Sequence, residues 1–342
     1  MKIFRLIKIK DVIFITREKF SSRVLDSYQL NYYIDKFDID KKSKHIGEII
    51  TSYLNNIKQV QYNYITENIS TTDLTSIKDA FILNVEKLTI PKREKVKYLE
   101  LGDEVVNDYY NIEEDWLKIR KGEYTNDVYF IYRNPIKSLF SGIFQDLFNN
   151  ESLKFSKSNF DFIYTITKDE YKDILFTDKF FENYKFENNY FFELSNKLQY
   201  NDNYKKFILS SVINHINING LSSNHKGTWL EYFKNTIYNN LSNSNFKLIN
   251  LDTGRKVDYF PIISKIYDVQ EDKLKINFSK KDSTENLREI LLEGLKSKDD
   301  IEVNYFIKRI NEYTYNDREI YKKIILSNNN LYKTNEDLYS TI

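Results

Sequence analysis

The sequence predicts an α/β fold with a central parallel sheet flanked by helices, and three observations support it. Val128–Tyr132 is apolar at every position, as expected for a strand covered on both faces. Asp11–Thr16 has the pattern of an earlier strand, and Arg23–Leu30 that of the helix after it. The segment after the central strand has apolar residues at the 3.6-residue spacing of a helix with one buried face: Ile136, Leu139, Phe140, Ile143, Phe144, Leu147 and Phe148.

Composition and charge restrict the class of protein. Hydrophobic side chains make up 41% of the 342 residues, which is enough for a large domain with its own core. The 51 basic and 50 acidic residues nearly cancel, so nothing indicates a general nucleic-acid binder. The chain has no cysteine and three histidines, so we expect no disulfide scaffold and no thiolate or histidine-rich metal site.

The start of the chain indicates its location. Basic residues are scattered through it, and the apolar core of a signal peptide is missing. No apolar run approaches the roughly 20 residues of a membrane helix. We therefore expect a cytoplasmic protein without a membrane span. No repeat, linker or low-complexity block divides the sequence, so we expect one domain over residues 1–342.

The other elements follow from periodicity and capping signals. One long helix after Ser43 has an apolar stripe at Ile46, Ile49, Ile50, Tyr53, Leu54, Ile57 and Val60. The remaining predictions are a helix at Leu74–Leu88, a strand at residues 96–101 (VKYLEL), a strand at Phe160–Thr165, a helix at Asn203–Ile216, a helix from Trp229 with Phe233 and Ile237 inward, a strand at Phe246–Leu251, and helices at Ser283–Leu295, Asp299–Tyr313 and Asp317–Ser327.

Polar groups occupy the turn between the central strand and its helix. Asn134 and Pro135 are suited to the N-cap and first helical positions, because asparagine accepts hydrogen bonds there and proline has a helical φ. Arg133 in the turn and Ser141 in the second helical turn lie near a helix N-terminus, which favours anions. Spacing alone leaves two interpretations open, a phosphate site or a salt-bridged arginine beside a surface serine.

This segment resembles a motif of the sulfotransferase family. Arg133-Asn134-Pro135, with Ser141 eight residues after the arginine, is similar to the R-[ND]-P-x5-S segment that binds the 3′-phosphate of 3′-phosphoadenosine 5′-phosphosulfate (PAPS). The resemblance implies a P-loop NTPase-like sulfotransferase fold with PAPS as sulfuryl donor and 3′-phosphoadenosine 5′-phosphate (PAP) as product. It also implies a PAPS-binding core in residues 10–150, an acceptor-side, largely helical part in 151–330 and a tail in 331–342.

The resemblance further implies a loop after the first strand that holds the 5′-phosphosulfate, of the type P-K-x-G-[ST]-[ST]. The segment Arg17–Ser22 matches its order, but Ser21 stands at the glycine position and Arg23 at the second hydroxyl position. Glycine lets backbone N–H groups approach a phosphate closely, so the path of this loop is in question. The implied cofactor-binding residues are Arg17, Lys19, Phe20, Ser21, Ser22, Arg23, Arg133 and Ser141.

The same resemblance implies the catalytic roles. Lys19, with the Ser21 and Ser22 hydroxyls, would stabilise negative charge on the leaving 5′-phosphate oxygen. A base would take the acceptor's proton. The candidates are Glu100, near the end of the predicted strand at 96–101, and His45, at the edge of the long helix; a capping carboxylate and a surface histidine are the other interpretations. No metal is required.

Two other functional classes stay open. Asp38-Ile39-Asp40 spells the D-x-D of nucleotide-sugar glycosyltransferases, which hold a divalent metal, although the surrounding residues favour a charged loop. A non-catalytic interaction protein on a decayed sulfotransferase fold is the second. Weaker anion candidates are His225, Lys226 and the turn at residues 252–256. The expected partner is a glycan or small-molecule acceptor with a hydroxyl or amine, and no nucleic acid.

Overall fold

Strands and helices follow one another along the chain as in α/β proteins. The computed structural model describes residues 5–9, 11–17, 22–39, 44–67, 74–110, 112–148, 202–219, 229–251, 290–291, 293–295, 301–329 and 331. The strands are β1 (Arg5–Ile9), β2 (Val12–Thr16), β3 (Val128–Tyr132) and β4 (Phe246–Asn250). The helices are α1 (Ser22–Lys36), α2 (Lys44–Glu67), α3 (Leu74–Glu86), α4 (Lys92–Tyr110), α5 (Ile112–Lys121), α6 (Pro135–Phe148), α11 (Asp202–Asn219), α12 (Trp229–Tyr232), α13 (Lys234–Asn240) and α16 (Ile301–Leu326).

The chain forms two compact units. Unit 1 comprises Met1–Arg133, Leu230–Ile276 and Ile320–Glu336, and therefore contains the whole sheet. Unit 2 comprises Asn134–Trp229, Asn277–Glu319 and Asp337–Ile342, and its described elements are helical. Within the described residues, no helix combines the length and the apolar character that a membrane span requires.

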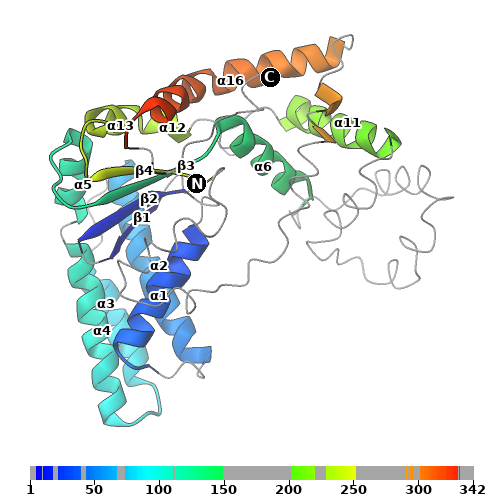
Figure 1. Cartoon of the computed structure of the whole chain (residues 1–342). Coiled ribbons are helices and arrows are strands. Elements are labelled where there is room, and N and C mark those ends of the chain that lie inside the picture. Colours follow the sequence, from blue (N-terminus) through cyan, green and yellow to red (C-terminus); the bar gives the residue numbers. More distant parts are fainter. Residues whose placement is uncertain are drawn as a thin grey trace, which may run out of the picture. The chain divides into compact units, whose positions relative to one another are not determined.

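The sheet of unit 1 has the order β1-β2-β3-β4 (Figure 1). β2, β3 and β4 are parallel, with Ile13 opposite Val128 and Val128 opposite Phe246. β1 joins the edge as an antiparallel partner of β2, with Arg5 opposite Thr16. The predicted α/β class and parallel core are confirmed, but the antiparallel edge strand was not predicted. Only two residues separate β1 from β2 in the sequence, and such a short connection can join only antiparallel strands.

Both faces of the central strand β3 are covered, and all five of its residues are buried. On one face the Phe130 ring packs edge-on against Phe233, which follows α12, with centroids 5.4 Å apart. On the other face Phe14 of β2 stacks on Tyr129 at 5.1 Å. Burial on both faces explains why the strand has no polar position, since none of its side chains faces solvent.

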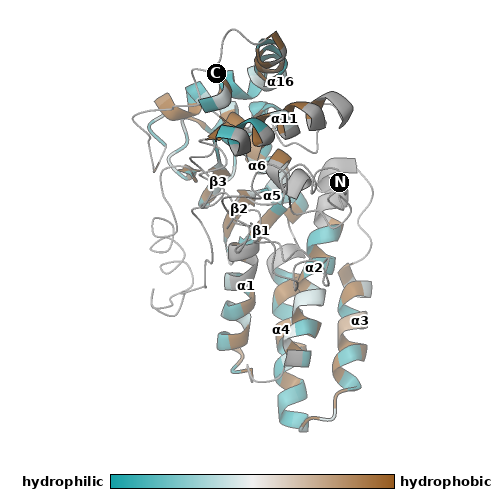
Figure 2. Cartoon of the chain, turned by 90° about the vertical axis from the view of Figure 1, so that its right-hand side faces the viewer, coloured by the Kyte–Doolittle hydropathy of each residue, from teal (hydrophilic) through white to brown (hydrophobic). Residues whose placement is uncertain are grey.

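Helices α1 to α4 stand side by side and extend away from the sheet (Figures 1 and 2). The predicted stripe of α2 is buried except at Ile49, which is half-buried. Tyr53 of this stripe stacks on Phe81 of α3 with centroids 4.2 Å apart, and its hydroxyl donates to the Gly102 carbonyl of α4 at 2.9 Å. The α3–α4 connection lies at the end of this bundle remote from the sheet (Figures 1 and 2).

Residues 96–101 form part of helix α4, so the strand predicted there is wrong. The short stretch VKYLEL is mostly apolar and therefore compatible with a strand, but the residues that α4 buries lie three and four positions apart: Tyr98, Leu101 and Val105. This spacing is that of a helix face and becomes visible only over a window longer than six residues.

The two helices predicted near the C-terminus form a single helix, α16. α16 is one continuous helix where the sequence predicted a break between Tyr313 and Asp317. Its buried face continues through that region with two polar residues, Thr314 and Asp317, which are 0% and 2% exposed. The Thr314 hydroxyl donates to the Ile310 carbonyl at 2.8 Å, so the helix itself satisfies it. Polar residues on the buried face concealed the apolar period.

Candidate functional site

The turn after β3 has the local geometry that its sequence predicts. Pro135 is the first residue of α6. The Asn134 side chain is 3% exposed, and its Oδ1 accepts hydrogen bonds from the backbone N–H of Ile136 at 2.9 Å and of Lys137 at 3.1 Å. This is the N-cap arrangement, which satisfies two of the free donors at the start of a helix. The capping prediction is confirmed.

Arg133 and Ser141, the two residues of the phosphate-binding prediction, are both half-buried. Arg133 directly follows β3 and is the last residue of the first segment of unit 1, Met1–Arg133. Ser141 lies in the second turn of α6, within unit 2. The positions of the two side chains along strand, turn and helix are as predicted, and their joint role in binding a phosphate stays a prediction.

Within unit 1, the carboxyl ends of the parallel strands carry two arginines. Arg17 follows β2 and is 2% exposed, and Arg133 follows the neighbouring strand β3. β4 ends at the fully buried Asn250, whose Nδ2 donates to the Tyr321 hydroxyl at 3.4 Å. Because parallel strands end at the same edge of a sheet, Arg17, Arg133 and Asn250 share this edge. We call these three residues the carboxyl edge.

The loop predicted to hold the 5′-phosphosulfate follows Arg17 directly. Its residues Lys19, Phe20 and Ser21 lie outside the described residues. Ser22 and Arg23 are the first two residues of α1, so the helix begins one residue before the predicted start at Arg23. The strand and the helix predicted on either side of this segment are present, and Arg17, the residue before it, belongs to the carboxyl edge.

The two candidate bases lie on helices of the α1–α4 bundle. Glu100 is an exposed residue in the middle of α4, so its predicted position near the end of a strand is wrong. His45 is exposed near the start of α2 and lines a groove together with Lys87 and Leu88, at the α3 end that leads to α4. That end is remote from the sheet (Figure 1). The structure therefore brings neither candidate to the carboxyl edge, and both roles stay predictions.

The Asp38-Ile39-Asp40 segment follows helix α1 rather than a strand. Asp38 has a left-handed backbone conformation (φ 49°), and its exposed carboxylate accepts a hydrogen bond from Lys97 Nζ at 2.8 Å. The hydrogen bond and charge of Lys97 lower the pKa of Asp38. Asp40 lies outside the described residues. The charged-loop interpretation is confirmed for Asp38, because this aspartate is paired with a lysine on α4.

Several weaker candidates cannot be placed. Residues 160–165, His225, Lys226 and the turn at 252–256 all lie outside the described residues. Among the residues that are described, no three histidine, aspartate or glutamate side chains gather as a metal site would require.

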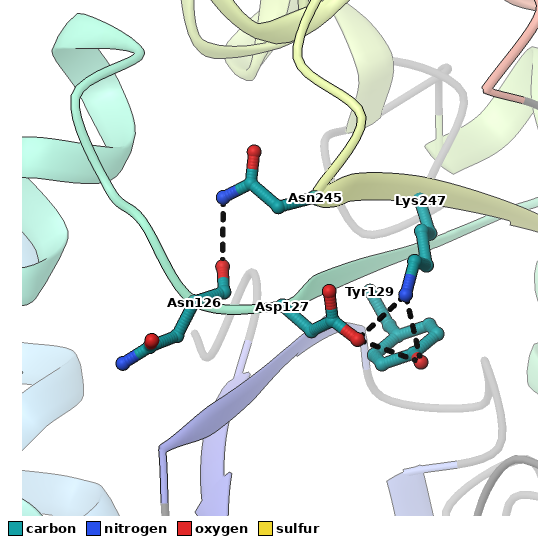
Figure 3. Close-up of polar contacts among 5 residues, drawn as sticks. All are labelled: Asn126, Asp127, Tyr129, Asn245 and Lys247. Atoms are coloured by element: carbon teal, nitrogen blue, oxygen red, sulfur yellow. Dashed lines mark hydrogen bonds and ion pairs between the residues drawn. The ribbon is translucent and has the colours of Figure 1, made fainter.

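A polar cluster at the opposite, amino ends of β3 and β4 was not predicted (Figure 3). Lys247 Nζ donates to Asp127 Oδ2 at 2.5 Å, and the Tyr129 hydroxyl donates to the same oxygen at 3.3 Å. Lys247 also lies over the Tyr129 ring, 5.2 Å from its centroid. Nearby, Asn245 Nδ2 donates to the Asn126 carbonyl at 2.8 Å (Figure 3). A lysine between two apolar residues of the predicted strand, Phe246 and Leu248, was the sequence signal for this cluster.

The cluster changes the ionisation of its members. Burial raises the pKa of the Tyr129 hydroxyl. Burial alone would lower the pKa of Lys247, but its hydrogen bond to Asp127 and the charges around it hold that pKa above its ordinary value. Both groups are therefore protonated at neutral pH, and the cluster is a charge-assisted connection between β3 and β4.

Comparison with protein-family models, with curated proteins and with solved structures finds no match to this chain.

Proposed function

We propose that this chain is a PAPS-dependent sulfotransferase that transfers a sulfuryl group to a hydroxyl or amine of a glycan or small-molecule acceptor. One observation carries the proposal: Arg17 and Arg133 follow the ends of adjacent parallel strands, β2 and β3. The ligand crevice of open α/β sheets lies at such strand ends. PAPS has phosphate groups at its 3′ and 5′ positions. Two arginines at the ends of neighbouring strands would provide one cation for each, Arg133 for the 3′-phosphate and Arg17 for the 5′-phosphosulfate.

The burial of Arg17 supports binding of an anion. Its side chain is 2% exposed at the point where the predicted phosphosulfate loop begins. A guanidinium interacts with phosphate more strongly where water is excluded, and its fixed fork suits bidentate contacts. Ser21 stands where the motif has a glycine, so backbone N–H groups approach the phosphate less closely. In the proposal, the positive charge of Arg17 compensates for these weaker contacts.

The proposed reaction is an in-line transfer. The bond between sulfur and the 5′-phosphate oxygen breaks while the acceptor oxygen or nitrogen forms its bond to sulfur, and the acceptor loses a proton to a base. Lys19 and Arg17 stabilise the charge that develops on the departing oxygen of PAP. Arg133 and Ser141 hold the 3′-phosphate, so that binding energy far from sulfur aligns the reacting atoms.

Calorimetric titration of the full chain with PAP, in the presence of a chelator, tests this proposal. We expect micromolar binding that Arg133→Ala weakens at least about tenfold, since a hydrogen bond to a charged group contributes about 1.5–3 kcal/mol. Arg133→Lys should recover only part of the affinity, because lysine lacks the guanidinium fork. Arg93→Ala is the matched control, since Arg93 is exposed on α4 away from the strand ends.

A folded wild-type chain that shows no affinity for PAP contradicts the proposal, as does an Arg133→Ala variant that binds like Arg93→Ala. Binding of a nucleoside diphosphate that depends on Mn²⁺ and is abolished by Asp38→Ala would instead favour a glycosyltransferase. If PAP binds, a screen of acceptors with sulfur-labelled PAPS identifies the substrate class.

A further inference from the structure

A groove of about 430 Å³ lies between helices α2 and α3, within unit 1. It extends along α2 from His45 to Asn56. Over these eleven steps a helix advances about 16 Å at 1.5 Å per residue. The volume is within the range of small-molecule sites in proteins, about 300–1,000 Å³. None of the residues of the carboxyl edge lines it.

The floor of this groove is apolar. Tyr53 of α2 and Phe81 of α3 stack on each other and are each 3% exposed, and the half-buried side chains of Ile49 and Ile77 lie beside them. The Tyr53 hydroxyl does not add polarity to the floor, because it donates to the Gly102 carbonyl of α4. A ligand that enters the groove therefore meets hydrocarbon at its base.

The rim is polar and mostly neutral. Ser52 and Asn56 of α2 and Asn84 of α3 are exposed along its length. Hydroxyl and amide groups both donate and accept hydrogen bonds, so these side chains suit a ligand with groups of both kinds. The charged side chains that line the groove include Glu48 and Lys87, whose opposite charges balance each other.

We propose that the α2–α3 groove binds a neutral oligosaccharide of about three pyranose rings. Each ring has an apolar face, which would lie on Ile49 and Ile77, and hydroxyl groups at its edge, which would bond to Asn56 and Asn84. A docked helix from another protein fits less well. Its backbone groups are already paired internally, so the rim amides could be satisfied only by side chains of that helix, and an amide left buried and unpaired would weaken binding.

Saturation-transfer NMR with the full chain and three neutral trisaccharides, maltotriose, cellotriose and triacetylchitotriose, tests this site. We expect at least one of them to bind with a dissociation constant of about 1 mM, as suits an open groove and few hydrogen bonds. Asn56→Ala and Asn84→Ala should each weaken that binding about fivefold, which corresponds to one lost neutral hydrogen bond.

Asn55→Ala is the matched control, because Asn55 is the neighbouring exposed asparagine on α2 and does not line the groove. Circular dichroism verifies that the variants fold, as expected for exposed positions. Absence of saturation transfer to all three trisaccharides overturns the proposal, and so does equal binding by Asn55→Ala, Asn56→Ala and Asn84→Ala. PAP binding is measured separately, so this site and the proposed nucleotide site can fail independently.

Discussion

Tyr53 connects three helices through one side chain, since its ring stacks on Phe81 and its hydroxyl donates to the Gly102 carbonyl. Burial raises the pKa of this hydroxyl well above its ordinary value of about 10. Burial also raises the pKa values of Tyr124 and Tyr129. All three therefore favour the protonated form in the folded state.

The sign of the resulting pH dependence of stability follows from the difference in tyrosine pKa between the folded and the unfolded chain. The unfolded chain loses these tyrosine protons near pH 10, whereas the folded chain retains them to higher pH. Their contribution to stability is thus complete below pH ~10 and is lost as the pH rises above that value. We expect the free energy of unfolding to fall steeply above pH ~10, in parallel with tyrosinate absorbance.

Tyr53→Phe tests this expectation by urea denaturation between pH 7 and 11. At neutral pH the variant should be about 1 kcal/mol less stable, because the Gly102 carbonyl loses its donor. Above pH ~10 the difference from wild type should shrink, since phenylalanine has no proton to lose. Tyr315→Phe, at an exposed position, should leave the whole profile unchanged. Parallel profiles for Tyr53→Phe and wild type would refute the role of Tyr53.

At the scale of elements, Gly122 determines how α5 ends before β3. It has φ +80°, and its N–H donates to the Ile119 carbonyl at 3.1 Å. A Cβ at this position would lie 2.5 Å from the Asn239 carbonyl oxygen. Glycine is therefore required both by the left-handed backbone conformation and by the close approach of α13.

We expect Gly122→Ala to destabilise the protein by about 3 kcal/mol, the sum of backbone strain and steric conflict. Gly47→Ala is the control, because Gly47 lies inside α2 and a Cβ there meets nothing within 4 Å. That change should stabilise the protein by about 0.5–1 kcal/mol through helix propensity. Denaturant midpoints measure both effects, and equal midpoints for the two variants would disprove the conflict at Gly122.

At the scale of the whole molecule, unit 1 is assembled from segments far apart in the sequence. Its sheet takes β4 from residues 246–250, and Tyr132 of β3 packs edge-on against Tyr321 of α16 at 5.7 Å. The edge of β4 is paired in turn, because Leu248 exchanges backbone hydrogen bonds with Asn329 and Leu331. The first 133 residues alone would leave one edge of β3 unpaired and one of its faces uncovered.

We therefore expect a fragment of residues 1–133 to lack a cooperative thermal unfolding transition, although it contains three of the four strands in the described part of the chain. The full chain should show such a transition by circular dichroism. Exposed β3, which is apolar at all five positions, should also make the fragment prone to aggregation. A fragment that melts as sharply as the full chain would show that β4 and α16 are not needed for the sheet.

Elements whose signals are local could be predicted from the sequence alone. The N-cap at Asn134, the buried strand β3 and the stripe of α2 were predicted because capping and periodicity depend on residues a few positions apart. Such signals failed where a short window was ambiguous, as at residues 96–101, or where buried polar residues such as Thr314 concealed the period of α16.

The identity of neighbouring strands, and of the side chains that share an edge, became visible only in the folded chain. The pairing of β2 with β3 and of β3 with β4 places Arg17, Arg133 and Asn250 together, whereas Glu100 and His45 lie on helices of the bundle. The groove between α2 and α3 likewise depends on two helices packing side by side. These arrangements result from burial of apolar surface between segments that are distant in the sequence. The hydrophobic effect depends on the area buried and not on which residues are neighbours in the sequence, so a local pattern does not reveal the partner.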